Sequence, residues 1–113
     1  MHEYSIVQNL LDQCEENAVA NGAKKVTKVV VKIGVMSGVE SQLLRTAFDT
    51  FKEETMCEEA EFIINIQPVI ICCNECDRES VLDKNEFCCP HCSSTSVTVI
   101  DGEDMYLMQL ELE

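Results

Sequence analysis

The sequence predicts an α+β protein: a small mixed domain of two helices and three strands, with an inserted zinc-ribbon-like module. Segments with helical spacing and segments rich in β-branched residues follow one another, and two Cys-x-x-Cys pairs stand between the second and third expected strands. A chain of 113 residues has material for one compact core. A second unit would therefore need a metal ion or disulfides to hold it together.

The first helix is expected from His2 to about Ala20, where apolar residues recur at three- and four-residue spacing. Asn21-Gly22 is the expected stop, because both residues tolerate a left-handed backbone. The β-branched segment from Val26 to Ile33 predicts a half-buried strand. Its two faces carry different residues: Val29, Val31 and Ile33 on one side, Lys28 and Lys32 on the other.

A second helix is expected after Ser37, because an apolar stripe at helical spacing follows it, and Ser37 and Glu40 have capping-box spacing. The stripe consists of Leu43, Leu44, Ala47, Phe48 and Phe51. Alternating residues predict the second strand, which ends at Pro68, and the third strand near the end of the chain. The alternating sets are Phe62, Ile64 and Ile66, and then Tyr106, Met108, Leu110 and Leu112.

These elements divide the chain into two units. We expect residues 1–68 and 101–113 to form an α+β domain and residues 69–100 to form a zinc-binding module. The main sheet must then close across the insert. Within the insert, Cys72–Cys76 and Cys88–Cys92 repeat the pattern C-C-x-x-C, which predicts two knuckles facing one ion.

The charge balance narrows the class of partner. With 21 acidic and 8 basic residues, the net charge of −13 repels the phosphates of nucleic acids and anionic membranes, so we expect neither as a partner. The negative charge favours cationic partners or metal ions. An acidic surface can also be explained by solubility alone. No stretch approaches the ~20 apolar residues of a spanning helix, and nothing resembles a secretory signal. We expect a cytoplasmic, reducing location.

The two cysteine pairs predict a structural zinc site with the ligands Cys73, Cys76, Cys89 and Cys92. Two residues between ligands let one tight turn aim both sulfurs at a tetrahedral ion, and four thiolates leave no open coordination position. Each knuckle needs a permissive backbone after its second cysteine, where Asp77 and Ser93 stand instead of the common glycine.

Other readings of the cysteines stay open. Cys72 or Cys88 can replace its neighbour as a ligand, although the longer gap fits the knuckle less well. A rubredoxin-type iron site uses the same four thiolates, and disulfide exchange is further possible chemistry. Cys14 and Cys57 are expected as buried or part-buried thiols, and His91 as an exposed knuckle residue.

The start of the chain offers a second, nitrogen-rich set of donors. In Met1-His2-Glu3, the α-amine, the backbone amide nitrogens and the imidazole can form fused chelate rings, which suit nickel(II) or copper(II). Each residue also has a simpler explanation. A terminal histidine is usually solvated, an early Glu3 favours the helix dipole, and Glu40 fits a capping box.

Three features together resemble the HypA/HybF family of hydrogenase nickel-incorporation proteins. They are the opening Met-His-Glu-Tyr-Ser, the segment Val-Val-Val-Lys-Ile-Gly-Val-Met-Ser-Gly-Val-Glu at 29–40, and the paired Cys-x-x-Cys insert. The resemblance covers essentially the whole chain. It implies a metallochaperone with a nickel site at the amino terminus and a separate zinc module that responds to it.

The resemblance also implies a ligand set and partners. Nickel, a transient cargo, would be held by His2, the Met1 amine and the Glu3 amide or carboxylate, with Glu40 near the metal; zinc would be the structural cofactor. The implied partners are a nickel-binding maturation GTPase, the hydrogenase large-subunit precursor and, in some organisms, urease accessory proteins. With only His2 and His91 available, no enzyme is expected. The rival hypotheses are a zinc-ribbon adaptor without nickel and an iron electron carrier.

Overall fold

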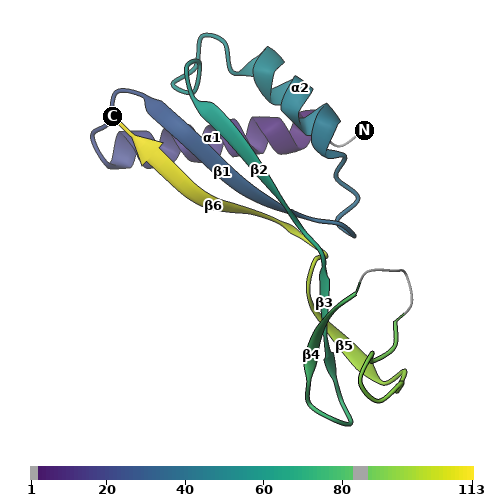
Figure 1. Cartoon of the computed structure of the whole chain (residues 1–113). Helices are drawn as coiled ribbons and strands as arrows, with labels where there is room; N and C mark the ends of the chain where they lie inside the picture. Colours follow the sequence, from purple (N-terminus) through teal and green to yellow (C-terminus); the bar gives the residue numbers. More distant parts are fainter. Residues whose placement is uncertain (1–2, 83–86) are drawn as a thin grey trace.

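The computed structural model, which describes residues 3–82 and 87–113, contains two three-stranded sheets at opposite ends of an elongated molecule (Figure 1). Its principal extents are 52 × 28 × 17 Å. One sheet carries both helices, and the other lies beyond them as a separate small body. We call residues 69–101, which form this second sheet and its loops, the cysteine module.

The first sheet has the strand order β2-β1-β6, with β1 (Val26–Gly34) in the centre. β2 (Glu61–Gln67) runs parallel to β1, and β6 (Met105–Leu112) runs antiparallel to it. A parallel pair needs a crossover, which α2 (Ser41–Phe51) provides. The expected closure of the main sheet across the insert is confirmed, because β6 pairs with β1 after the cysteine module.

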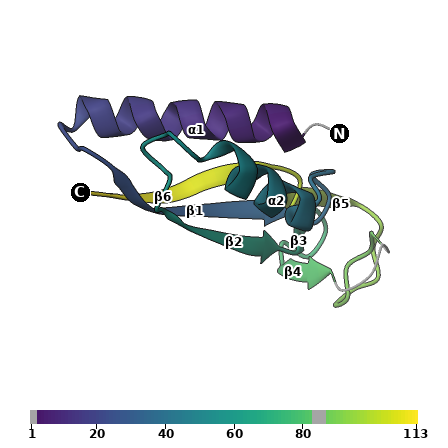
Figure 2. The same cartoon turned by 90° about the horizontal axis from the view of Figure 1, so that it is seen from above.

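Both helices cover one face of this sheet, as the view from above shows (Figure 2). α1 (Glu3–Ala20) buries Val7, Leu10, Leu11, Cys14 and Ala18. Leu44, Ala47 and Phe48 of α2 join the same core. The sheet contributes Val29, Val31 and Ile33 to it, as the alternation in the sequence predicted, and Phe48 stacks on Phe62 with ring centroids 4.1 Å apart. Lys28 and Lys32 lie on the opposite, half-buried face.

The helix boundaries confirm one sequence expectation and correct another. α1 ends at Ala20, and Gly22 follows in a left-handed conformation with φ of 68°. The capping box predicted from Ser37 and Glu40 is wrong, because α2 begins at Ser41 and Glu40 is itself the N-cap. Its carboxylate accepts a hydrogen bond from the Leu43 amide at 2.7 Å. The Ser37 hydroxyl instead accepts a bond from the Val39 amide.

β6 departs from the alternation expected for it. A register shift between Val30 and Val31 of β1 leaves Met108 unpaired on β6, so the side chains change face at that point. Leu107 and Leu110 pack against the core, whereas Tyr106 and Met108 are about half exposed. The predicted apolar face of Tyr106, Met108, Leu110 and Leu112 is therefore wrong in its first half.

The second sheet has the order β4-β3-β5, all antiparallel, with β3 (Val69–Cys73), β4 (Glu79–Leu82) and β5 (Val97–Asp101). Only Val69, Ile71, Cys73 and Cys89 are buried among its described residues, and none belongs to the main core. Across the described ranges, no helix is long and apolar enough to span a membrane.

The stacked pair Phe48 and Phe62 gives a test of the core. Phe48 is fully buried, so Phe48→Ala should leave a cavity and lower the free energy of unfolding by about 3–5 kcal/mol. Leu43→Ala, on the same helix but 54% exposed, should change it by no more than about 0.5 kcal/mol. Urea unfolding followed by circular dichroism measures both, and equal losses would contradict the assignment of the core.

Candidate metal centres

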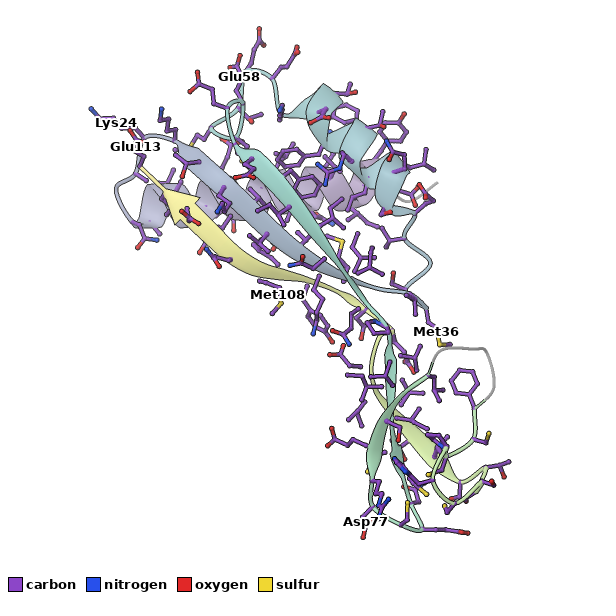
Figure 3. All side chains as sticks on the ribbon, in the orientation of Figure 1. Lys24, Met36, Glu58, Asp77, Met108 and Glu113 are labelled. Atoms are coloured by element: carbon purple, nitrogen blue, oxygen red, sulfur yellow. The ribbon has the colours of Figure 1, made fainter. Side chains whose placement is uncertain are left out.

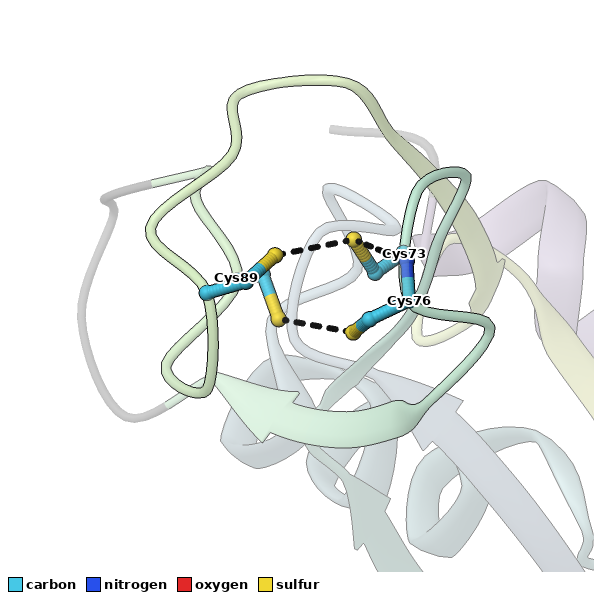
Figure 4. A group of neighbouring side chains, drawn as sticks. Cys73, Cys76 and Cys89 are labelled. Atoms are coloured by element: carbon cyan, nitrogen blue, oxygen red, sulfur yellow. Dashed lines mark hydrogen bonds between the residues drawn. The ribbon is translucent and has the colours of Figure 1, made fainter.

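Two hairpin-like loops bring four cysteines together at the far end of the cysteine module. Cys73 ends β3, Cys76 lies in the turn before β4, and Cys89 and Cys92 lie in the turn before β5. Figure 4 shows Cys73 and Cys76 on one loop facing Cys89 on the other. The four sulfur atoms all lie within 4.8 Å of one another.

The spacing of the sulfurs fits a tetrahedral ion. The Cys73 and Cys92 sulfurs are 3.5 Å apart, and those of Cys76 and Cys89 are 3.7 Å apart. Four sulfurs at the ~2.3 Å typical of zinc–thiolate bonds would be separated by roughly 3.8 Å. The geometry of these side chains therefore suits one four-coordinate ion, with no position left for a substrate.

The two loops have the same backbone construction. The Asp77 amide donates to the Cys73 carbonyl at 3.0 Å, and the Ser93 amide donates to the Cys89 carbonyl at 2.8 Å. Asp77 and Ser93 have positive φ values of 58° and 64°. The left-handed backbone expected after each second cysteine is thus present, adopted here by residues other than glycine.

Backbone amides around the first cysteine of each knuckle favour thiolates. At Cys73, the amides of Cys76 and Glu75, each 3.4 Å from the sulfur, lower the pKa of the thiol. At Cys89, burial alone would raise the pKa, but the amides of Cys92 and His91 outweigh it and the pKa falls to about 7. The knuckles therefore provide the charged sulfur that a metal requires.

At Cys92 the balance is the opposite. The Ser94 amide lowers the pKa of the Cys92 thiol. The neighbouring Cys73 thiol and burial have the larger, opposite effect, and the pKa rises to about 12. Four close sulfurs cannot all be charged without a cation among them. A bound divalent ion would remove this conflict, so the four sulfurs are suited to hold one metal ion.

The remaining cysteines lie outside this cluster. Cys72 and Cys88 are half-buried and are absent from the group of sulfurs that face one another. Cys14 and Cys57 are fully buried in the main core, as expected. His91 is exposed, and its Nδ1 lies 3.3 Å from an Arg78 guanidinium nitrogen.

The predicted nickel ligands are described only in part. Met1 and His2 lie outside the described residues. Glu3 is buried, with 5% of its surface exposed, and its carboxylate accepts a hydrogen bond from the Glu40 amide at 3.3 Å. The structure thus brings Glu3 and the start of α2 together, while the Glu40 carboxylate turns to the Leu43 amide. Sequence reasoning missed this bond because nothing local relates residues 3 and 40.

The Glu3 carboxyl is held in its charged form. Hydrogen bonds to this carboxylate, among them the one from the Glu40 amide, lower its pKa to about 2. Beside it, Glu3, Tyr4, Leu43, Thr46 and Ala47 line a hollow of about 210 Å³ between the two helices. An ionised, buried carboxylate next to the start of the chain is compatible with a cation there.

Fold and cysteine cluster together define a small α+β protein that carries a tetrathiolate metal module. Residues 1–112 match the family described as hydrogenase/urease nickel incorporation metallochaperone, HypA. The chain therefore belongs to the HypA family, whose members are metallochaperones and maturation factors rather than enzymes.

Individual relatives match this chain along nearly their whole length. The chain is 57% identical to the hydrogenase maturation factor HypA of Shewanella baltica (strain OS185), over all of this chain and 97% of that protein. It is 52% identical to the corresponding factor of Aquifex aeolicus, over all of this chain and 98% of that one. The solution structure of the nickel metallochaperone HypA from Helicobacter pylori aligns with a TM-score of 0.71 and 37% identity, covering 99% of this chain and 97% of that one.

The lowered pKa of Glu3 gives a test at low pH. A carboxyl whose pKa is lower in the folded state stabilises the fold above its unfolded pKa, near 4.5, and this contribution is lost as the pH falls towards 2. Glu3→Gln should therefore unfold at lower urea concentration than the unmodified chain at pH 7, and the difference should shrink below pH 4. Glu16→Gln, at an exposed position of the same helix, is the control; a pH-independent gap for Glu3→Gln would contradict the assignment.

Proposed function

We propose that this chain binds nickel(II) at its amino terminus and delivers it during maturation of a nickel-iron hydrogenase, while a structural zinc ion holds the cysteine module. The observation that carries the proposal is the family match over residues 1–112, joined to a four-sulfur cluster in the small sheet that lies apart from both helices. Residues 1–68 and 101–113 would form the nickel-binding domain and residues 69–100 the zinc-binding module.

Zinc is the favoured metal for the cluster of Cys73, Cys76, Cys89 and Cys92. A closed set of four thiolates serves folding, since it leaves no site for chemistry. The module has few buried apolar residues, so the free energy of metal binding would replace the core that it lacks. Iron would use the same ligands, and visible charge-transfer absorption of the purified protein would identify it.

Nickel would be held mainly by nitrogen atoms. The carboxylates of Glu3 and Glu40 already accept hydrogen bonds from backbone amides. The proposed donors are the Met1 amine, the His2 imidazole and amide, and the Glu3 amide or carboxylate, with Glu40 near the metal. Amine and imidazole bind protons in competition with metal, so acidification should release nickel, as a carrier of transient cargo requires.

The further steps of delivery need other proteins. We propose a nickel-binding maturation GTPase as the donor or helper and the hydrogenase large-subunit precursor as the recipient, with urease accessory proteins as additional partners where urease is present. A cytoplasmic location is proposed with them, supported by the eight free cysteines of the structure. The alternative is a zinc-ribbon adaptor that contacts proteins without carrying nickel.

Nickel titration distinguishes these two functions. Calorimetry of tag-free, zinc-loaded protein at pH 7 should show nickel binding that His2→Ala abolishes, because the imidazole is lost from the chelate. His91→Ala is the matched control and should bind nickel as the unmodified chain does. Equal behaviour of all three proteins, with zinc content unchanged, would favour the adaptor.

Substitution of two adjacent cysteines tests which of them binds zinc. Cys89→Ser should purify with well under one zinc per chain, because it removes a thiolate of the cluster. Cys88→Ser, one residue away, should retain a full equivalent. Elemental analysis of both variants decides between them, and the reverse result would mean that Cys88 has taken the place of its neighbour.

A further inference from the structure

The two outer strands of the first sheet, β2 and β6, each have one edge that faces away from β1. On β2 this edge is blocked. The Gln67 carbonyl bonds to the Val35 amide on the β1 side, so the alternation of the strand directs the Phe62 carbonyl outward. The Arg45 guanidinium of α2 donates to that carbonyl at 2.9 Å and lies over the Phe62 ring. A charged side chain placed across the backbone opposes pairing with a further strand.

The outer edge of β6 carries no such block. The carbonyls of Asp104 and Glu113, at its two ends, both accept hydrogen bonds from the β1 side. Counted inward past the bulge at Met108, the alternation directs the N–H and C=O groups of four residues away from β1. These residues are Met105, Leu107, Leu110 and Leu112. In the ranges 3–82 and 87–113, no other element donates to these carbonyls or accepts from these amides.

A groove between α1 and β6 lies beside this open edge. It has a volume of about 230 Å³ and is lined by Ile6, Asn9, Leu10, Gln13, Met105 and Leu107. Figure 1 shows β6 as the outermost strand of its sheet, and Figure 3 shows Met108 on the outer side of β6. Because side chains alternate along a strand, a segment paired with β6 would direct every second side chain towards this groove.

The two segments that border the groove carry charges of one sign. α1 contains four acidic residues and no lysine or arginine. Residues 101–113 contain five acidic residues and again no lysine or arginine. Lys28 and Lys32 of the neighbouring β1 are already paired with Glu111 and Asp101. A second copy of this chain, with its net charge of −13, would therefore be repelled at this edge, whereas a basic segment would be attracted.

We propose that the outer edge of β6 binds an extended basic segment of a partner protein, which pairs as a fourth strand of the first sheet. Main-chain hydrogen bonds to β6 hold the segment, and the groove accepts its apolar side chains at alternate positions. The positions between them face the side of the sheet that carries the exposed Glu111, where lysine or arginine is favoured. This binding needs no nickel and is tested separately from the proposed function.

A synthetic peptide of alternating valine and lysine, about ten residues long, is the probe, since β6 has eight residues. Fluorescence anisotropy of the labelled peptide measures its affinity for the full chain at physiological salt. The same peptide with every backbone amide N-methylated keeps its charge and side chains but cannot donate to β6. It should bind at least about tenfold more weakly, because several main-chain hydrogen bonds are lost. Equal affinities would show attraction by charge alone and would overturn the proposal, as would no binding of either peptide.

Two variants of α1 with the same change of charge locate the binding surface. Gln13→Arg places a cation and extra bulk in the groove and should weaken binding of the unmethylated peptide at least about tenfold. Gln8→Arg, at an exposed position outside the groove lining, should change the affinity no more than about twofold. Equal losses in the two variants would overturn the proposal.

NMR of the full chain with the unmethylated peptide identifies the edge that pairs. The amide signals of Met105, Leu107 and Leu110 should shift on binding, whereas those of Phe62 and Ile64 on β2 should not. Shifts confined to β2 would overturn the proposal. So would a dimer of the free chain, seen by light scattering and abolished by Gln13→Arg, because a second copy would then occupy the edge.

Discussion

Four cysteine sulfurs, gathered at the end of a short sheet, are the interaction on which the second half of this fold depends. In the described part of the module, only three residues are fully buried: Ile71 and the two cysteines Cys73 and Cys89. So little apolar surface cannot offset the conformational entropy of ordering some thirty residues. Amides of the two knuckles point at the sulfurs and favour thiolates, so the backbone is already arranged to receive an ion.

The first sheet, in contrast, is stabilised by apolar packing. Its core of two helices and three strands is continuous and apolar, and it needs no metal to hold it. The start of α1 lies at one edge of this core, where Glu3 is fixed by the Glu40 amide. On the proposed function, a nickel site at the chain end and a structural zinc site in the insert would release their metal ions at different rates within one small protein.

The sequence was sufficient to predict what depends on local pattern. Helical stripes, the alternation of Val29, Val31 and Ile33, and the spacing of the cysteines each predicted the observed element. Sequence patterns failed where one residue changes a strand register or a helix boundary. A bulge at Met108 reverses which side chains of β6 face the core. At the start of α2, Glu40 rather than Ser37 is the N-cap. Contacts between distant residues, such as Gly34 on Gly102, leave no periodic signal and needed the structure.

The proposed function requires nickel and zinc to occupy chemically different sites in one chain. X-ray absorption at the nickel and zinc edges, on full-length protein loaded with equimolar amounts of both, tests it most directly. We expect zinc to be surrounded by sulfur alone at about 2.3 Å, and nickel to be surrounded by nitrogen and oxygen without sulfur. Nickel with sulfur neighbours would mean that nickel enters the cysteine cluster, and separate sites for the two metals would then be wrong.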